Sequence, residues 1–158
     1  ALPISLLAKG LPRNSVIAAK FISMTLLWTL SLGCSFFITF TYNFMFWSIS
    51  WIPYLSLITI GVWLFGLMLI AALILGGVGK GTVSASMLCA GCLFLLCVLV
   101  TMFNATADVS PFVFLSQYQL FLTKGITAVQ FAKPAVCAIV LTILQLSAAS
   151  ILFQRKSL

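Results

Sequence analysis

The residues that could do chemistry in this sequence are few, and they are not grouped. Histidine is absent, and Asp108 is the single acid among 158 residues. General acid and base steps, proton relays and metal centres all need several titratable side chains close together. We therefore expect no catalytic residue, no metal site and no bound cofactor, and we expect that the chain is not itself an enzyme.

Two short motifs have part of the pattern of a known site. Cys89 and Cys92 have the CxxC spacing of metal and redox sites, but no second pair and no histidine accompany them, so we interpret them as packing residues. The segment GGVGKGT, from Gly76 to Thr82, is similar to a phosphate-binding loop. The phosphate-binding pattern ends in Gly-Lys-Ser/Thr, whereas here Lys80 is followed by glycine, so the segment does not match the pattern of a nucleotide site. The glycines predict a tight turn instead.

Long uncharged stretches dominate the chain and indicate membrane spans. Residues 21–79 carry no charge, and two more uncharged stretches cover residues 81–107 and 134–154. A helix needs about 20 residues to cross the hydrocarbon core, so the first stretch holds two spans and a turn. The sequence, 63% hydrophobic and 6% charged, therefore predicts an all-α integral membrane protein. Its four expected spans cover residues 16–42, 54–76, 83–103 and 134–153.

The basic residues orient these spans, because positive charge gathers in short cytoplasmic loops. One side of the predicted membrane holds Lys9, Arg13, Lys20, Lys80, Arg155 and Lys156. Lys124 and Lys133 lie on the other side together with Asp108. We therefore expect a multi-pass protein of the plasma or inner membrane with both termini in the cytoplasm. The net charge of +7 then reflects topology, and we expect no nucleic-acid partner.

The expected external segment of residues 110–132 is apolar but too short to cross. It begins with SPFVFLSQYQLFLT, is interrupted at Lys124 and Gly125, and continues as ITAVQFA. We expect a re-entrant pair of short helices that enters the outer leaflet and returns, which requires cover from protein or a water-filled cavity. Just before it, residues 104–106 form a glycosylation sequon at Asn104 on the external side.

The first 16 residues predict a short amphipathic element at the cytoplasmic face. Leu6, Leu7 and Leu11 can rest on lipid or protein, while Lys9 and Arg13 reach water. An interfacial helix of this kind can receive a partner protein. The alternative is a basic flank that only sets the topology of the first span.

These features occur in a recognisable order. LPRNSVIAAKF precedes a span, a tight inner turn carries Lys80, SPFVFL…LFLTKG follows the penultimate span, and the last span ends in LFQRKSL. This order resembles the C-terminal two-thirds of a type-2 ABC exporter permease. The family pattern Leu-Pro-x-Ser/Arg followed by Ala-Lys is matched at Leu11, Pro12, Arg13, Ala19 and Lys20. The resemblance implies that the four spans are the family's third to sixth, so that either the chain is a fragment or a partner supplies the first two.

The resemblance also implies a membrane subunit without ATP chemistry of its own. In that family two membrane subunits pair, and a coupling helix on the inner face docks on a separate ATPase whose ATP hydrolysis drives transport. The coupling residues here would be Leu6, Leu7, Lys9, Leu11, Pro12 and Arg13. The expected partners are an ABC ATPase, a second membrane subunit and the lipid bilayer.

The third span suggests which substrate such an exporter would carry. Met87, Phe94 and Met102 can lie on one side of this span, which favours an amphipathic or hydrophobic substrate. Gln145 in the fourth span forms either a hydrogen bond between helices or part of a polar pathway. The alternative from another class is an ATP-independent membrane assembly or anchor subunit. A channel has less support, because no charged ring or filter-like sequence is present.

Overall fold

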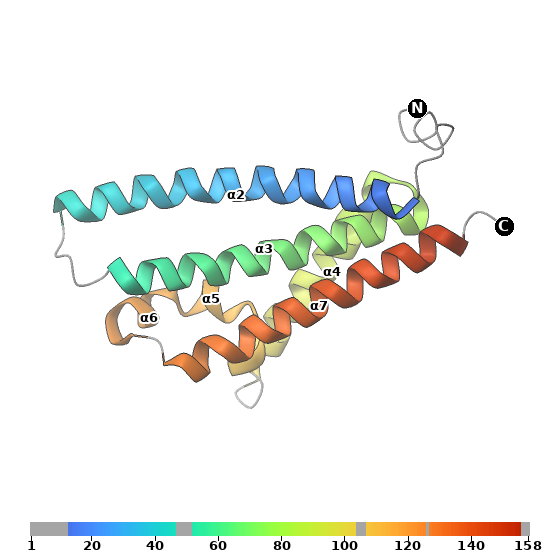
Figure 1. The fold of residues 1–158 in the computed structure, drawn as a ribbon. Helices are drawn as coiled ribbons and strands as arrows, with labels where there is room; N and C mark the ends of the chain where they lie inside the picture. The colour runs from blue at the N-terminus through green and yellow to red at the C-terminus, as the bar shows by residue number, and fades with distance from the viewer. Residues whose placement is uncertain (1–12, 47–51, 104–106, 126, 156–158) are drawn as a thin grey trace.

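The computed structural model describes residues 13–46, 52–103, 107–125 and 127–155, and every regular element in these ranges is a helix. The long helices are α2 (Arg13–Phe46), α3 (Ile52–Lys80), α4 (Val83–Met102) and α7 (Ala128–Arg155). Between α4 and α7 lie the short elements η2 (Ala107–Val109), α5 (Val113–Ser116) and α6 (Tyr118–Lys124). Figure 1 shows their arrangement as a bundle with both ends of the described chain on the same side.

The long helices are apolar along most of their length. Four helices contain a stretch long and hydrophobic enough to cross a bilayer, with mean hydropathy between 1.8 and 2.6. A helix also satisfies its own backbone hydrogen bonds, as a lipid environment requires. The structure therefore confirms the predicted all-helical architecture with four candidate spans, and it indicates a multi-pass membrane protein.

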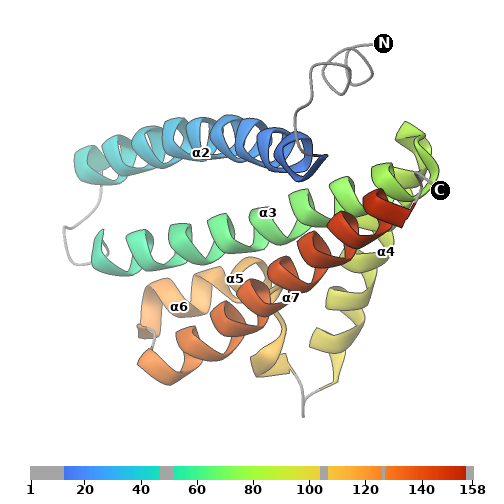
Figure 2. The ribbon, with the colours of Figure 1, turned by 45° about the vertical axis from the view of Figure 1, so that its right-hand side comes forward.

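Helix α3 is the centre of the bundle. It packs against α2 and α7, and α4 folds back along it after a short turn (Figures 1 and 2). Half of the apolar stretch of α3 is buried within the chain, whereas none of the stretch in α2 is buried. The buried side chains of α3 include Ile58, Phe65, Met68, Ile70 and Ile74. The core therefore follows α3, and α2 lies at the edge of the bundle.

Helix α7 begins earlier than the sequence predicted. We expected the fourth span to start at Pro134, but α7 starts at Ala128 and passes through this proline. A capping box accounts for the early start: the Gln130 N–H donates to Thr127 Oγ1 at 3.4 Å, and the Thr127 N–H donates to Gln130 Oε1 at 3.2 Å. Residues 128–132 of the segment ITAVQFA therefore begin α7 and do not form a separate short helix.

The segment between α4 and α7 folds back onto the bundle. Ser110 is buried, and its hydroxyl donates to the Cys97 carbonyl of α4 at 2.9 Å. The Phe114 side chain of α5 is fully buried against α3. A Cβ atom at Gly61 of α3 would lie 2.6 Å from the Phe114 ring, so the close approach needs glycine at this position. These two contacts hold α5 and α6 against the long helices.

Candidate functional site

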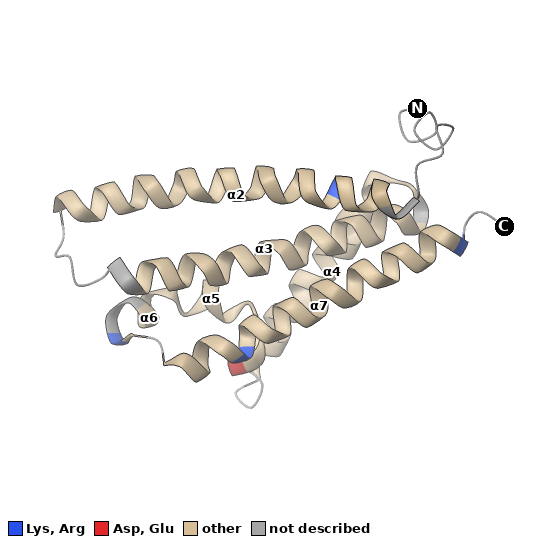
Figure 3. Ribbon diagram, viewed as in Figure 1, with Lys and Arg blue, Asp and Glu red and all other residues tan. Residues whose placement is uncertain are grey.

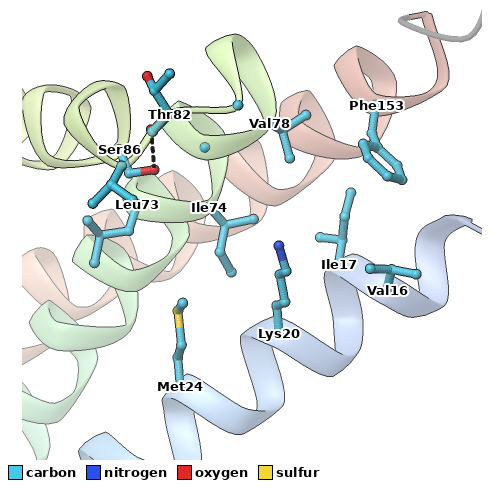
Figure 4. A pocket seen from close by; sticks show the side chains of 13 residues that line it. Val16, Ile17, Lys20, Met24, Leu73, Ile74, Val78, Thr82, Ser86 and Phe153 are labelled. Atoms are coloured by element: carbon cyan, nitrogen blue, oxygen red, sulfur yellow. Dashed lines mark hydrogen bonds between the residues drawn. The ribbon is translucent and has the colours of Figure 1, made fainter. Parts of the chain in front are cut away.

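A cavity of about 470 Å³ opens at the end of the bundle where α3 turns into α4. The first turns of α2, the last turns of α3, the start of α4 and the end of α7 surround it (Figure 4). Its apolar walls are Ile17, Met24, Leu73, Ile74, Val78 and Phe153. The cavity has the size of a small-molecule site and a lining that is mostly hydrophobic.

Lys20 is the charged side chain among the described residues that line this cavity. Its ammonium group extends from α2 into the space that faces the last turns of α3 (Figure 4). The single acid of the chain, Asp108, lies in η2, beyond the other end of α4 (Figure 3). The cavity therefore carries a positive charge that no acidic side chain of this protein neutralises.

The turn that borders the cavity is tight, in agreement with its glycine content. Gly81 and Thr82 alone separate the end of α3 from the start of α4. The Gly81 N–H donates to the Gly77 carbonyl at 2.8 Å, and Gly81 has a φ of +70°, which favours glycine. Thr82 caps α4, because its side-chain oxygen accepts from the Ala85 N–H, and the Ser86 hydroxyl donates to the Thr82 carbonyl. Two hydroxyl groups thus lie at the rim of the cavity.

Some polar side chains of the long helices are buried within the bundle. Three buried atoms have no hydrogen-bond partner within the described ranges: Thr25 Oγ1 and Trp28 Nε1 of α2, and Gln145 Oε1 of α7. Trp63 of α3 is paired, since its Nε1 donates to Thr29 Oγ1 at 2.9 Å. A buried polar atom without a partner costs free energy unless water or a ligand pairs with it. These atoms are therefore the unpaired polar groups of the described bundle interior, on α2 and α7.

Of these three residues, only Gln145 was singled out from the sequence. The structure gives its Oε1 no partner on another described helix. Thr25 and Trp28 were missed because a threonine and a tryptophan inside an apolar span are ordinary packing residues. Their spacing of three positions, which places both on one face of a helix, was the available signal.

The structure separates the residues predicted to line a path. On α4, Met87 and Met102 are 63% and 76% exposed. Phe94 of the same helix packs edge-on against Phe112, with ring centres 5.5 Å apart. Gln145 lies on α7. The two methionines therefore face outward, whereas Phe94 packs α4 against Phe112, the residue just before α5.

The predicted coupling segment lies almost entirely outside the described residues. Leu6, Leu7, Lys9, Leu11 and Pro12 fall there, and Arg13 is the first residue of α2. The structure does describe the helix that follows, which brings Ile17 and Lys20 to the wall of the cavity. The start of α2 and the end of α7 lie at the same end of the bundle (Figure 1).

Metal-ligating side chains are scattered in the described part of the chain. No group of three or more His, Cys, Asp or Glu occurs among those residues. Cys89 and Cys92, the CxxC pair, are free cysteines on α4, and Cys92 is exposed.

No family model, no curated protein and no solved structure matches this chain. Its function is therefore inferred from its own residues and their arrangement.

Proposed function

We propose that this chain is a membrane permease subunit of an ABC-type exporter. It moves an amphipathic or hydrophobic substrate across the membrane, and a separate ATPase subunit hydrolyses the ATP. The observation that carries the proposal is the order and packing of the elements: α3 joined to α4 by a tight turn, then α5 and α6 folded against α3 before α7. This is the order that the resemblance to type-2 exporter permeases implies.

Exposed apolar faces on α2 and α4 support a second membrane subunit. Leu27, Leu30 and Phe37 of α2 are each 70% exposed, and most of α4 is exposed in the same way. Small exposed residues accompany them, Gly33 on α2 and Gly91 on α4, and neither glycine has an atom within 4 Å of a Cβ position. Small residues let a partner helix approach closely, which is how helices associate in lipid.

The distribution of charge supports a cytoplasmic location for both termini. Lys20 lines the cavity where α3 ends, and Arg155 is the last residue of α7, which ends on the same side (Figure 1). Lys124 ends α6, Lys133 lies early in α7 and Asp108 lies in η2, so these charges belong to the other part of the bundle; Figure 3 colours the charged residues. Positive residues favour the cytoplasmic side of a membrane. We therefore place the first 16 residues in the cytoplasm, where their leucines and basic residues dock on the ATPase, and we place the protein in the plasma or inner membrane.

The short helices support the proposed re-entrant element. Phe114 and Phe121 are buried toward α3, whereas Leu115 and Leu120 on the same segment are exposed. A segment that is apolar on both its packed and its open side fits lipid better than water. We propose that α5 and α6 occupy the outer leaflet.

Polar atoms inside the bundle support an amphipathic substrate. Thr25 Oγ1, Trp28 Nε1 and Gln145 Oε1 offer one acceptor amide oxygen, one indole donor and one hydroxyl among apolar surroundings. Met87 and Met102 of α4 face outward, so they would join a transport path only where a second membrane subunit covers α4. Such a combination matches a molecule with one polar and one hydrophobic part.

The alternative is an ATP-independent assembly or anchor subunit. The exposed faces of α2 and α4 favour it as well, because they can hold partner helices without any transport. The two functions differ in one partner: an exporter subunit binds and stimulates an ABC ATPase, and an anchor does not. A gene for an ABC ATPase beside the gene for this chain is expected for the exporter only.

The test measures ATPase stimulation by the chain with its ATPase partner in lipid vesicles. We expect Arg13→Glu to lower stimulation by removing a contact with an acidic rim, and Leu11→Ala to weaken association by about 1–3 kcal/mol if the leucine is an anchor. Lys133→Glu is the matched control at the opposite end and should leave stimulation unchanged. Full stimulation by the Arg13 and Leu11 variants at normal membrane amounts would contradict the coupling role of this segment.

A further inference from the structure

The cavity at the turn between α3 and α4 combines one cation with long apolar walls. Lys20 supplies the charge, Thr82 and Ser86 supply hydroxyl groups at the rim, and Met24, Leu73 and Ile74 continue the wall away from the rim (Figure 4). We propose that this cavity binds one anionic phospholipid. The phosphate group pairs with the Lys20 ammonium, and an acyl chain lies along the apolar side chains between α2 and α3.

The charge of the cavity calls for an anion from outside the chain. Asp108 is the single acidic side chain of the sequence, and it lies in η2, after the far end of α4, so no acidic side chain of the described residues lies beside Lys20. The Lys20 side chain is exposed at the mouth of the cavity, so its ammonium group is accessible to an anionic headgroup. Basic pockets between spanning helices on the cytoplasmic side are the places where anionic lipid headgroups bind.

The depth of Lys20 along α2 matches the level of a headgroup. Helix α2 has 34 residues and is therefore about 51 Å long, whereas the hydrocarbon core is about 30 Å thick. If the excess is shared between both ends, about seven residues lie outside the core at each end. Lys20 is the eighth residue of α2. Its ammonium group therefore lies at the boundary between hydrocarbon and headgroups, and Met24, one turn further, lies in the hydrocarbon.

The lining favours a lipid over a soluble anion. Inorganic phosphate would occupy only the Lys20 end of a cavity of about 470 Å³, and the walls at Ile17, Leu73 and Ile74 would remain without a partner. An acyl chain covers these walls and is supplied by the membrane itself. The proposal does not depend on transport, because an anchor subunit with the same cavity would bind the same lipid.

Native mass spectrometry of the full-length chain tests the proposal. The protein is released from micelles that contain equal amounts of phosphatidylglycerol and phosphatidylcholine, and the ratio of the two in the complex with one lipid is measured. We expect phosphatidylglycerol to be preferred by about fivefold, the effect of one lysine near a lipid surface. Lys20→Gln should reduce the ratio to near one, and Lys133→Gln, the matched control, should leave it unchanged.

A second variant separates the cavity from the charge. Met24→Trp keeps Lys20 and fills the apolar part of the cavity, so we expect it to lower the amount of retained phosphatidylglycerol severalfold at unchanged helix content. Three results would overturn the proposal: an equal loss in Lys20→Gln and Lys133→Gln, full retention in Met24→Trp, or displacement of the lipid by inorganic phosphate at constant ionic strength. The last result would assign the cavity to a soluble anion.

Discussion

At the scale of single residues, several hydroxyl groups of α2 are bonded within their own helix, although Thr25 is not. Ser35 Oγ donates to the Ser31 carbonyl at 3.0 Å, and Thr39 Oγ1 donates to the Ser35 carbonyl at 2.8 Å. Such bonds satisfy the hydroxyl group without a partner helix. A helix with several serines and threonines therefore stays compatible with lipid, and these residues do not by themselves indicate a pore.

Trp63 differs, because its indole N–H bonds Thr29 on a neighbouring helix. We predict that Thr29→Val lowers the free energy of unfolding by about 0.5–1.5 kcal/mol, since the side chain keeps its shape and loses the acceptor of the Trp63 indole together with its own bond to the Thr25 carbonyl. Circular dichroism during unfolding in mixed micelles measures this change. Thr41→Val, which removes only a bond to the Phe37 carbonyl within α2, is the control and should have a smaller effect. Equal effects of the two variants would show that the bond between α2 and α3 adds nothing.

At the scale of elements, α3 holds its neighbours by presenting glycine where they touch it. A Cβ atom at Gly66 would overlap the Trp28 indole of α2 at Cε2 and Nε1, and one at Gly61 would overlap the Phe114 ring. Spanning helices gain little from the hydrophobic effect, because lipid is as apolar as their side chains, so close packing decides which faces meet. These two glycines therefore set the positions of α2 and α5 on α3.

We predict that Gly66→Ala destabilises the protein by about 1–3 kcal/mol, because the added methyl group forces the Trp28 indole and α2 away from α3. Gly33→Ala is the matched control: nothing lies within 4 Å of a Cβ atom there, so the change should be neutral or stabilising by up to about 1 kcal/mol. Unfolding in mixed micelles gives both values. A double variant with Trp28→Leu should recover part of the loss. Identical behaviour of both glycine variants would refute the packing contact.

At the scale of the whole molecule, the charges define two ends of one bundle. The apolar stretches of all four long helices lie between these ends, and the short helices α5 and α6 lie near the end that carries Lys124 (Figure 3). A bilayer has two polar surfaces separated by hydrocarbon, which is the pattern that this arrangement of charge fits. The orientation across the membrane then depends on which end is the more basic.

We predict that Lys124→Cys, in a variant without the native cysteines, is labelled by an impermeant maleimide in intact cells, because the proposed topology puts this end of the bundle outside. Arg155→Cys should be labelled only after the cells are permeabilised. Both side chains are exposed in the structure, so a difference in labelling reports the side of the membrane and not burial. Ser110 is unsuitable as a probe, because its side chain is buried. Labelling of Arg155→Cys in intact cells would reverse the topology.

The sequence predicted the number of long apolar helices and their approximate places, but not every boundary. The uncharged stretches were sufficient to predict these helices. A single stretch of chain in lipid must satisfy its backbone hydrogen bonds locally, and only a helix does so. The early start of α7 could have been predicted from Thr127 and Gln130, which have the three-residue spacing of a capping box. It was missed because Pro134 was taken as the first residue of the span, although proline is tolerated inside membrane-spanning helices and Pro134 lies inside α7.

The sequence by itself determined that this chain is helical, apolar and charged at the turns and ends, since those properties depend on each stretch of about 20 residues alone. Only the tertiary structure decided that α3 is central, that Phe114 packs on Gly61, and that Lys20 faces a cavity with Leu73 and Phe153. A spanning helix is apolar on every side, so its hydrophobic pattern does not show which face meets a neighbour. That choice depends on the shapes of side chains distant in the sequence, which meet only in the folded bundle.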